Sequence, residues 1–206
     1  MLGEDLQNYH QQFQSIKLDA QEILADLTDI HLAWQPGKDR WSIAQCIDHL
    51  LVTGNNSLSN IRTAINEARS KGLFSEGPFR YGVLERWFVR QMEPPAKIRF
   101  KAPRAYLPSG QRNYAEIVRN FYILQDEFLK CIQESKGLDL ARVRVSNPVI
   151  RWFRLSLGQE IAFNAAHERR HLWQAQQVRQ QISPPLGTLG GAHSSTVIKS
   201  GLRGLV

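Results

Sequence analysis

Apolar residues recur at three- and four-residue steps over four long stretches of this chain, which is the spacing of amphipathic helices. The stretches cover residues 2–29, 42–68, 111–135 and 155–182. Ser42 is a suitable N-cap for the second helix, and Gln45, three residues later, completes a capping box. Because strand-type alternation is rare, the pattern predicts an all-α protein built as a four-helix bundle.

Two irregular connections separate the predicted helices. Residues 69–108 join the second helix to the third and contain one short predicted helix at about Val83–Met92, which Pro94 and Pro95 stop. A connection of this length is usually functional, or an insertion packed on the bundle. Residues 138–154 form the other irregular connection, which leads into the last helix.

The chain of 206 residues has the length of a single domain. We expect the bundle to occupy residues 1–183, followed by a Gly- and Ser-rich tail over residues 184–206. No apolar run approaches the roughly 18 residues of a membrane helix, and the polar, acidic N-terminus resembles neither a secretory nor a transit signal. The sequence therefore predicts a cytoplasmic protein without membrane contact, with Cys46 and Cys131 as free buried thiols.

The formal net charge is +7, and the basic excess is local. It falls in residues 96–112 and 142–154. Such a patch can contact phosphates or acidic small molecules, or serve only solubility. Because the chain carries no helix-turn-helix signature, zinc finger or RNA-binding aromatic motif, we expect no nucleic-acid partner.

The last predicted helix carries two histidines four residues apart, His167 and His171. A helix places such residues on one face, about 6 Å apart along its axis, where two imidazoles can bind one metal ion. The core-facing stripe is apolar at both ends but polar at Asn164, Glu168 and His171. Buried polar groups need partners, and a metal is one such partner. Many histidine pairs of this spacing are nevertheless ordinary core or surface residues.

A third histidine, His49, lies near the start of the second predicted helix. The helix face around it is polar but uncharged, which suits a lined cavity, whereas Asp48 is expected on the solvated side. Four-helix bundles build metal sites from facing helices, so His49 is a candidate partner for the pair. The same pattern fits a half-buried histidine with a backbone partner.

Two motifs carry a family resemblance: WSIAQCIDHL at residues 41–50 and HERRHLWQ at residues 167–174. Together they resemble the early-helix and last-helix motifs of the DinB-like (DinB/YfiT-like) metalloenzyme family. The resemblance implies a four-helix bundle of that type and one divalent metal ion, with His49, His167 and His171 as ligands. Zinc, nickel, iron and manganese are the candidate ions.

The resemblance also implies a small-molecule substrate, a low-molecular-weight thiol as cosubstrate, and a homodimer. Characterised members of the family act as bacillithiol or glutathione transferases or as mycothiol-dependent isomerases. The chain departs from the family pattern in its long 69–108 connection and its Gly-rich tail. These departures bear on the substrate and leave the argument for the histidine triad unchanged.

Three neutral histidines leave coordination positions open, which is the pattern of a catalytic metal site. The expected function is a metal-dependent transferase that activates a thiol, or water, for attack on a small electrophile. Glu168 is a candidate base or an orienting partner of a ligand, and a salt bridge to a neighbouring arginine is an equal interpretation. Gln45 and Asn164 lie one turn from the ligands and are candidates to hydrogen-bond them.

Two other functions remain open from the sequence. The ion could serve only to join two helices of a non-catalytic binding or dimerisation module. Residues 167–171 also satisfy the H-E-x-x-H pattern of zincin hydrolases, with Glu168 as base. The rest of that pattern is missing, because no Asp or Glu follows Glu168 and because Gln174 and Gln177 occupy the positions of the extended motif's Gly and His.

Overall fold

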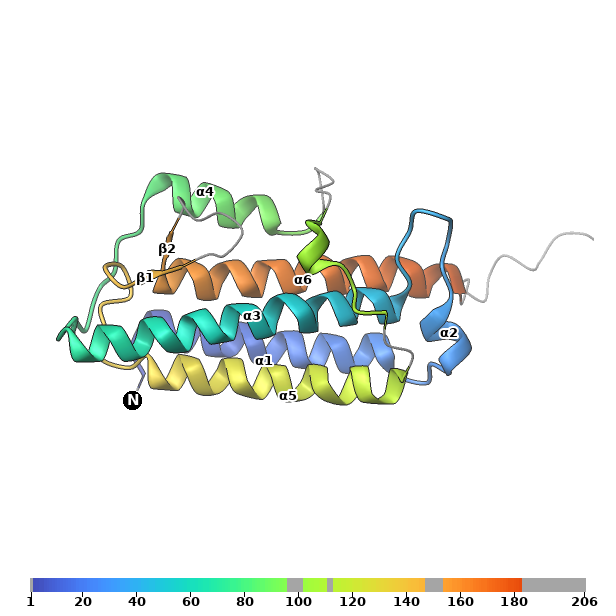
Figure 1. The fold of residues 1–206 in the computed structure, drawn as a ribbon, viewed down its shortest axis with the longest axis horizontal. Helices are drawn as coiled ribbons and strands as arrows, with labels where there is room; N and C mark the ends of the chain where they lie inside the picture. Colours follow the sequence, from blue (N-terminus) through green and yellow to red (C-terminus); the bar gives the residue numbers. More distant parts are fainter. Residues whose placement is uncertain (1, 96–101, 111–112, 147–153, 183–206) are drawn as a thin grey trace, which may run out of the picture.

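Four long helices form the protein, as a computed structural model that describes residues 2–95, 102–110, 113–146 and 154–182 shows (Figure 1). They are α1 (Glu4–Leu24), α3 (Ile43–Ser70), α5 (Tyr114–Glu134) and α6 (Leu157–Ile182). The smaller elements are α2 (Asp29–Ala33), α4 (Val83–Met92), the 3-10 turn η1 (Arg104–Tyr106), β1 (Arg144–Val145) and β2 (Leu155–Ser156). The prediction of an all-α four-helix bundle is confirmed, and the short helix α4 has the bounds that the sequence indicated.

The bundle closes around one apolar core. Helices α1 and α3 each pack against both α5 and α6, so α5 and α6 occupy diagonally opposite corners. At the centre the rings of Phe13 and Phe128 stack with centroids 4.7 Å apart. Helices α3 and α5 lie close together at Gly54, where a Cβ atom would be 2.7 Å from the Leu124 side chain. The amphipathic periodicity of the sequence thus corresponds to one apolar face on each of the four helices, and these faces point into the core.

The capping box predicted at the start of α3 is present. The Ser42 hydroxyl accepts a hydrogen bond from the Gln45 backbone N–H at 3.2 Å, and the Gln45 side chain accepts one from the Ser42 N–H at 3.0 Å. These bonds satisfy backbone donors that a helix start leaves open. They fix the beginning of α3 two turns before His49.

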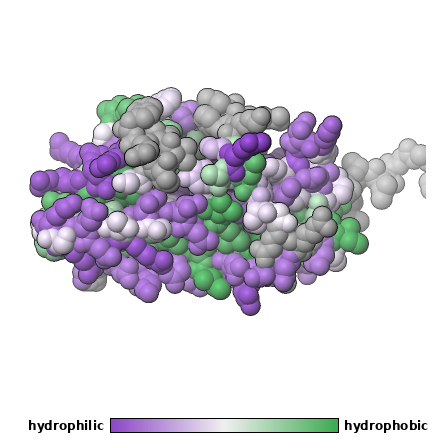
Figure 2. Space-filling model, viewed as in Figure 1, coloured by the Kyte–Doolittle hydropathy of each residue, from purple (hydrophilic) through white to green (hydrophobic). Residues whose placement is uncertain are grey.

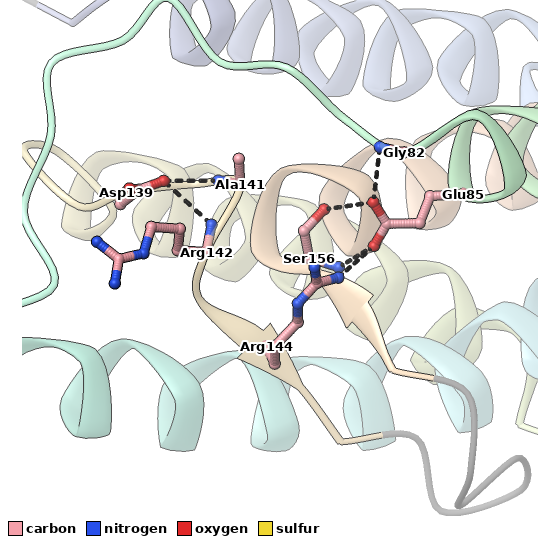
Figure 3. Close-up of polar contacts among 7 residues, drawn as sticks. All are labelled: Gly82, Glu85, Asp139, Ala141, Arg142, Arg144 and Ser156. Atoms are coloured by element: carbon pink, nitrogen blue, oxygen red, sulfur yellow. Dashed lines mark hydrogen bonds and ion pairs between the residues drawn. The ribbon is translucent and has the colours of Figure 1, made fainter.

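Helix α4 lies along the outside of α6 and is fastened at its N-terminal end by Glu85 (Figure 3). This carboxylate is nearly buried and accepts hydrogen bonds from Gly82 N–H, from the backbone and hydroxyl of Ser156, and from Arg144 at 2.6 Å. Its partners belong to α4, β1 and β2, and so one side chain joins the long connection to the start of α6. Figure 2 shows hydrophilic side chains over much of this face of the molecule.

Two short elements were not predicted because they are too short to produce a periodic pattern. One is α2, which follows α1 and has Thr28 as its N-cap. The irregular connection 138–154 contributes β1, which pairs antiparallel with β2 over two residues each. The tail over 184–206 and most of the basic residues 96–112 lie outside the described residues. Among the helices that are described, none combines the length and the apolar character that crossing a bilayer requires.

Candidate metal centre

The structure brings His49, His167 and His171 together. His49 comes from α3, and the other two come from successive turns of α6. One ligand atom from each lies within 4.8 Å of the others, and the Nε2 atoms of His49 and His167 are 3.3 Å apart. His49 and His171 are almost fully buried, whereas His167 keeps partial exposure. Of the three histidines, His167 is therefore the one that keeps contact with solvent.

The protonation state of His49 follows from its hydrogen bond. Its Nδ1 lies 2.5 Å from the carbonyl oxygen of Tyr106, which only accepts, so Nδ1 carries the proton. This leaves the lone pair on Nε2 directed at the other two histidines. Tyr106 belongs to the long connection. The sequence did not indicate its contact with His49, because a backbone carbonyl leaves no mark in the pattern of residue types.

The residue next to His49 holds the same loop. Both carboxylate oxygens of Asp48 accept a hydrogen bond from the Ser109 hydroxyl at 2.9 Å, and one also accepts the Gly110 N–H at 3.2 Å. Asp48 is only 4% exposed, so its predicted place on the solvated side was wrong. The cap of α5 is Asn113, whose side chain accepts a backbone N–H at 3.1 Å. Residues 48 and 49 together fix the loop that orients one candidate ligand.

His171 has a comparable partner one turn along α6. Its Nδ1 lies 3.2 Å from the Gln174 side-chain oxygen, which accepts a hydrogen bond from the ring N–H and so leaves the lone pair on Nε2. The three-residue spacing on a helix is the signal that could have identified Gln174 from the sequence. Two of the three imidazoles thus have an outer partner that fixes the tautomer.

The three imidazoles are neutral at ordinary pH. Burial lowers the pKa of His49, and burial lowers the pKa of His167 to about 3, with His49 and Arg170 contributing. Burial and the neighbouring histidines also lower the pKa of His171 well below its usual value. Neutral nitrogens that converge within one small space fit a divalent transition metal, because each can give a lone pair to the same ion.

Aromatic rings wall the histidines on two sides. Trp41 lies against His171, with ring centroids 5.6 Å apart, and against His49 at 4.8 Å. On the other side Phe163 stacks on His167 at 5.9 Å, and Phe88 of α4 stacks on Phe163 at 5.2 Å. These rings restrict the imidazole orientations and keep water from their flanks.

The two arginines inside the histidine motif anchor α4. Arg169 donates to both carboxylate oxygens of Glu93, at 3.0 and 2.5 Å, and Arg170 donates to the Gln91 carbonyl at 3.2 Å. A bidentate pair of this kind fixes geometry as well as charge. The sequence between the two candidate ligands therefore determines where the C-terminal end of α4 lies.

Glu168 faces the interior of the bundle. It is 2% exposed, and neither carboxylate oxygen has a hydrogen-bond partner among the described residues. Burial raises its pKa to about 8, while the Gln125 amide of α5 and the charge of Arg169 oppose that rise. Gln125 is fully buried, and its own amide also lacks a described partner. Whether Glu168 acts as a base stays a prediction.

The hydrogen bonds of Gln45 and Asn164 run to groups other than the triad. Besides capping α3, the Gln45 side chain accepts a hydrogen bond from Gln35 at 2.6 Å. Asn164 donates to Ser57 at 2.7 Å and to the Glu160 carbonyl at 2.8 Å. Among the described residues the structure shows no hydrogen bond from either side chain to a histidine. The support of the ligands by these two side chains therefore stays a prediction.

The two cysteines are free and buried, as the sequence predicted. Cys46 lies one turn before His49 on α3, but burial raises the pKa of its thiol to about 12. A metal-binding cysteine requires the thiolate form. The structure therefore favours Cys46 as a core residue.

Comparison with known proteins shows the family to which the chain belongs. The profile of the DinB superfamily matches residues 13–175, which contain all three histidines. The uncharacterized protein YuaE of Bacillus subtilis (strain 168) is 23% identical over 171 residues, which cover 82% of this chain and 96% of that protein. No solved structure gives a significant match. With four-fifths of its length matched by the family profile, the chain belongs to the DinB superfamily.

Proposed function

We propose that this protein is a metal-dependent transferase that joins a low-molecular-weight thiol to a small electrophile, with water as the alternative nucleophile. The observation that carries the proposal is the convergence of three neutral histidines, two buried and one partly exposed, whose ligand atoms lie within 4.8 Å of one another. Three protein ligands with further positions open are the arrangement of catalytic rather than structural metal sites.

His49, His167 and His171 would hold the ion, and zinc, nickel, iron or manganese suits this proposal. A bound divalent ion would supply Lewis acidity, which lowers the pKa of a thiol or water that reaches it. The protein's own part is orientation. Tyr106 and Gln174 fix the tautomers of two ligands, so that both rings present a lone pair without rearrangement.

The surroundings of the triad support chemistry at one restricted opening. Trp41 and Phe163 exclude water from the flanks of the imidazoles, and the partial exposure of His167 leaves an approach for substrate. A dry wall strengthens electrostatic interactions inside the site. Glu168, which is held on the core side of α6, is proposed to accept or return a proton only where a local rearrangement brings it to the reacting group.

The test begins with metal content. Elemental mass spectrometry on untagged protein should find about one divalent ion per chain, and His49→Ala should lose it. His10→Ala, which changes a histidine on α1 outside the triad, is the matched control and should keep the ion. A transfer assay with several thiols and electrophiles follows on the metal-loaded protein, with the His49→Ala variant as the blank.

Three results would overturn the proposal. Metal that survives the loss of His49, or protein that takes up no metal under any loading condition, would contradict the three-histidine site. Metal binding that is normal but leaves no position accessible to thiol or water would instead favour a metal-stabilised binding module.

A further inference from the structure

The outer face of α4 carries apolar side chains where a surface helix is normally polar. Val83, Leu84 and Trp87 are 75%, 61% and 56% exposed, and helix geometry places them within about 100° of arc. The opposite face, with Glu85 and Met92, is buried. Packing on α6 therefore explains the inner face of this helix but not the outer one, where three neighbouring apolar side chains form an exposed patch.

The exposed charges beside this patch are all basic. Arg86 and Arg90 border the apolar residues along one edge of the helix, and Arg80 precedes its first turn. All three arginines are exposed, and none has an ion-pair partner among the described residues. These arginines and the apolar patch are together called the α4 surface.

The two acidic residues of this segment do not offset the arginines. Glu85 is 8% exposed and pairs with Arg144 at 2.6 Å, as Figure 3 shows. Glu93 accepts hydrogen bonds from Arg169 on both carboxylate oxygens. Both acids are thus neutralised by arginines outside the α4 surface. The α4 surface therefore keeps its positive charge and is complementary to an anionic partner.

The shape of this region favours a flat partner over a peptide. Helix α4 lies on the outside of the four-helix bundle, along α6 (Figure 1). Peptide partners usually dock in a groove between elements, whereas a single raised helix can lie in the plane of a bilayer interface. Tryptophan prefers the depth of the lipid headgroups, and arginine can direct its guanidinium to phosphates while its stem lies along apolar groups.

We propose that the α4 surface docks the protein onto an anionic lipid membrane, with its apolar side chains at the headgroup level and its arginines on lipid phosphates. The expectation of no membrane contact rested on the lack of a spanning segment. None of the described helices could cross a bilayer, but a helix that lies in the interface needs no such length. The proposal does not depend on the reaction proposed above.

Docking would also orient the candidate metal centre. On the inner side of α4 the Phe88 ring stacks on Phe163 at 5.2 Å, and Phe163 stacks on His167 at 5.9 Å. His167 is the candidate ligand that keeps contact with solvent. The helix that contacts the membrane would therefore be the same helix that packs beside this ligand.

The test is co-sedimentation of the full chain with extruded vesicles. Vesicles of phosphatidylcholine alone are compared with vesicles that contain about 30% phosphatidylglycerol. We expect the wild-type protein to bind the anionic vesicles about tenfold more tightly or better. Salt at about 0.5 M should remove most of this difference, because it screens the attraction between arginines and phosphates.

Variants then assign the binding to α4. Trp87→Ala should weaken binding to the anionic vesicles about tenfold, because one aromatic side chain no longer enters the interface. Arg86→Gln combined with Arg90→Gln should weaken it about thirtyfold, because two charges near the lipid phosphates are lost. All three side chains are exposed, so the helix content measured by circular dichroism should be unchanged.

Two matched controls change the same kinds of residue elsewhere. Ile123→Ala shortens an apolar side chain of α5 that is 52% exposed. Arg40→Gln combined with Arg119→Gln removes two charges from exposed positions outside α4. Both controls should bind the anionic vesicles nearly as tightly as the wild type.

Three outcomes would overturn the proposal. The first is wild-type protein that binds the anionic vesicles no better than phosphatidylcholine. The second is an equal loss in the two double arginine variants, which would assign the binding to net charge rather than to α4. The third is a wild-type dimer that ignores vesicles and that Trp87→Ala converts to a monomer in analytical ultracentrifugation, which would assign the α4 surface to a second copy of the chain.

Discussion

Replacing Glu168 by glutamine should change how the stability of the metal-free protein depends on pH. In the folded state burial raises the pKa of this carboxyl from 4.5 to about 8. Between these values the folded protein holds a proton that the unfolded chain has released. The unfolded state therefore binds fewer protons, and the free energy of unfolding falls as pH rises through this window.

The size of the effect follows from the shift. One pKa unit corresponds to about 1.36 kcal/mol, so a rise from 4.5 to about 8 costs about 5 kcal/mol of stability at high pH. Most of this loss falls between about pH 5 and pH 8. Glu168→Gln keeps the shape of the side chain without its charge, so the variant should lose correspondingly less stability over the same interval.

The measurement is urea unfolding of both proteins, followed by circular dichroism at several pH values in a chelating buffer. The difference between wild type and variant cancels the titration of groups that both proteins share, the histidines included. Glu22→Gln, an exposed control, should follow the wild type. A wild-type to Glu168→Gln difference that stays constant across the interval would refute the reasoning, since Glu168 would then not change protonation within it.

Three further predictions concern the surroundings of the triad. Asp48→Ala should weaken metal binding, measured by competition with a chelator, because the loop that orients His49 loses its hydrogen bonds to the Asp48 carboxylate. Asp48→Asn keeps one acceptor oxygen and should weaken metal binding less. Gly158→Ala should destabilise the protein by about 1–3 kcal/mol in thermal unfolding, because the added Cβ would lie 2.2 Å from the Tyr81 hydroxyl, and the double variant with Tyr81→Phe should recover part of the loss. Metal affinity should stay nearly constant from about pH 8 to about pH 6 and fall only at lower pH, because the lowered pKa values keep the histidines unprotonated. A tenfold loss of affinity per pH unit that begins near pH 6.5 would contradict this prediction.

Much of the fold could be predicted from the sequence because a long helix repeats its three- and four-residue spacing of apolar positions many times. Helix α4 was also predicted, since Pro94 and Pro95 mark its end. The two-residue strands and the five-residue helix α2 were missed, because a period of 2 or 3.6 residues cannot be recognised in so few positions. Their presence depends on local caps and on single side chains such as Glu85, which act through tertiary contacts.

For the site, the sequence predicted residues that carry their chemistry in the side chain. His167 and His171 follow from spacing, and His49 follows from the bundle context and the family resemblance. Tyr106 acts through its carbonyl, which every residue possesses, so no motif could point to it. Asp48 was misplaced for a related reason: its partners come from a loop whose path the helical pattern does not describe.

The long connection between α3 and α5 is therefore part of the candidate metal centre rather than an appendage. It contributes the Tyr106 carbonyl at one end of the site and, through α4, the Phe88 ring and the Glu93 carboxylate at the other. Arg169, between the two histidines of α6, holds α4 in place, so the same short motif supplies candidate ligands and fixes the segment that covers them. A change of substrate could then arise within this connection without any change to the ligands, because its contacts determine the shape of the approach while the helices hold the histidines. Exchanging residues 83–95 for the matching segment of a relative should accordingly alter thiol or electrophile preference and leave metal content at about one ion per chain.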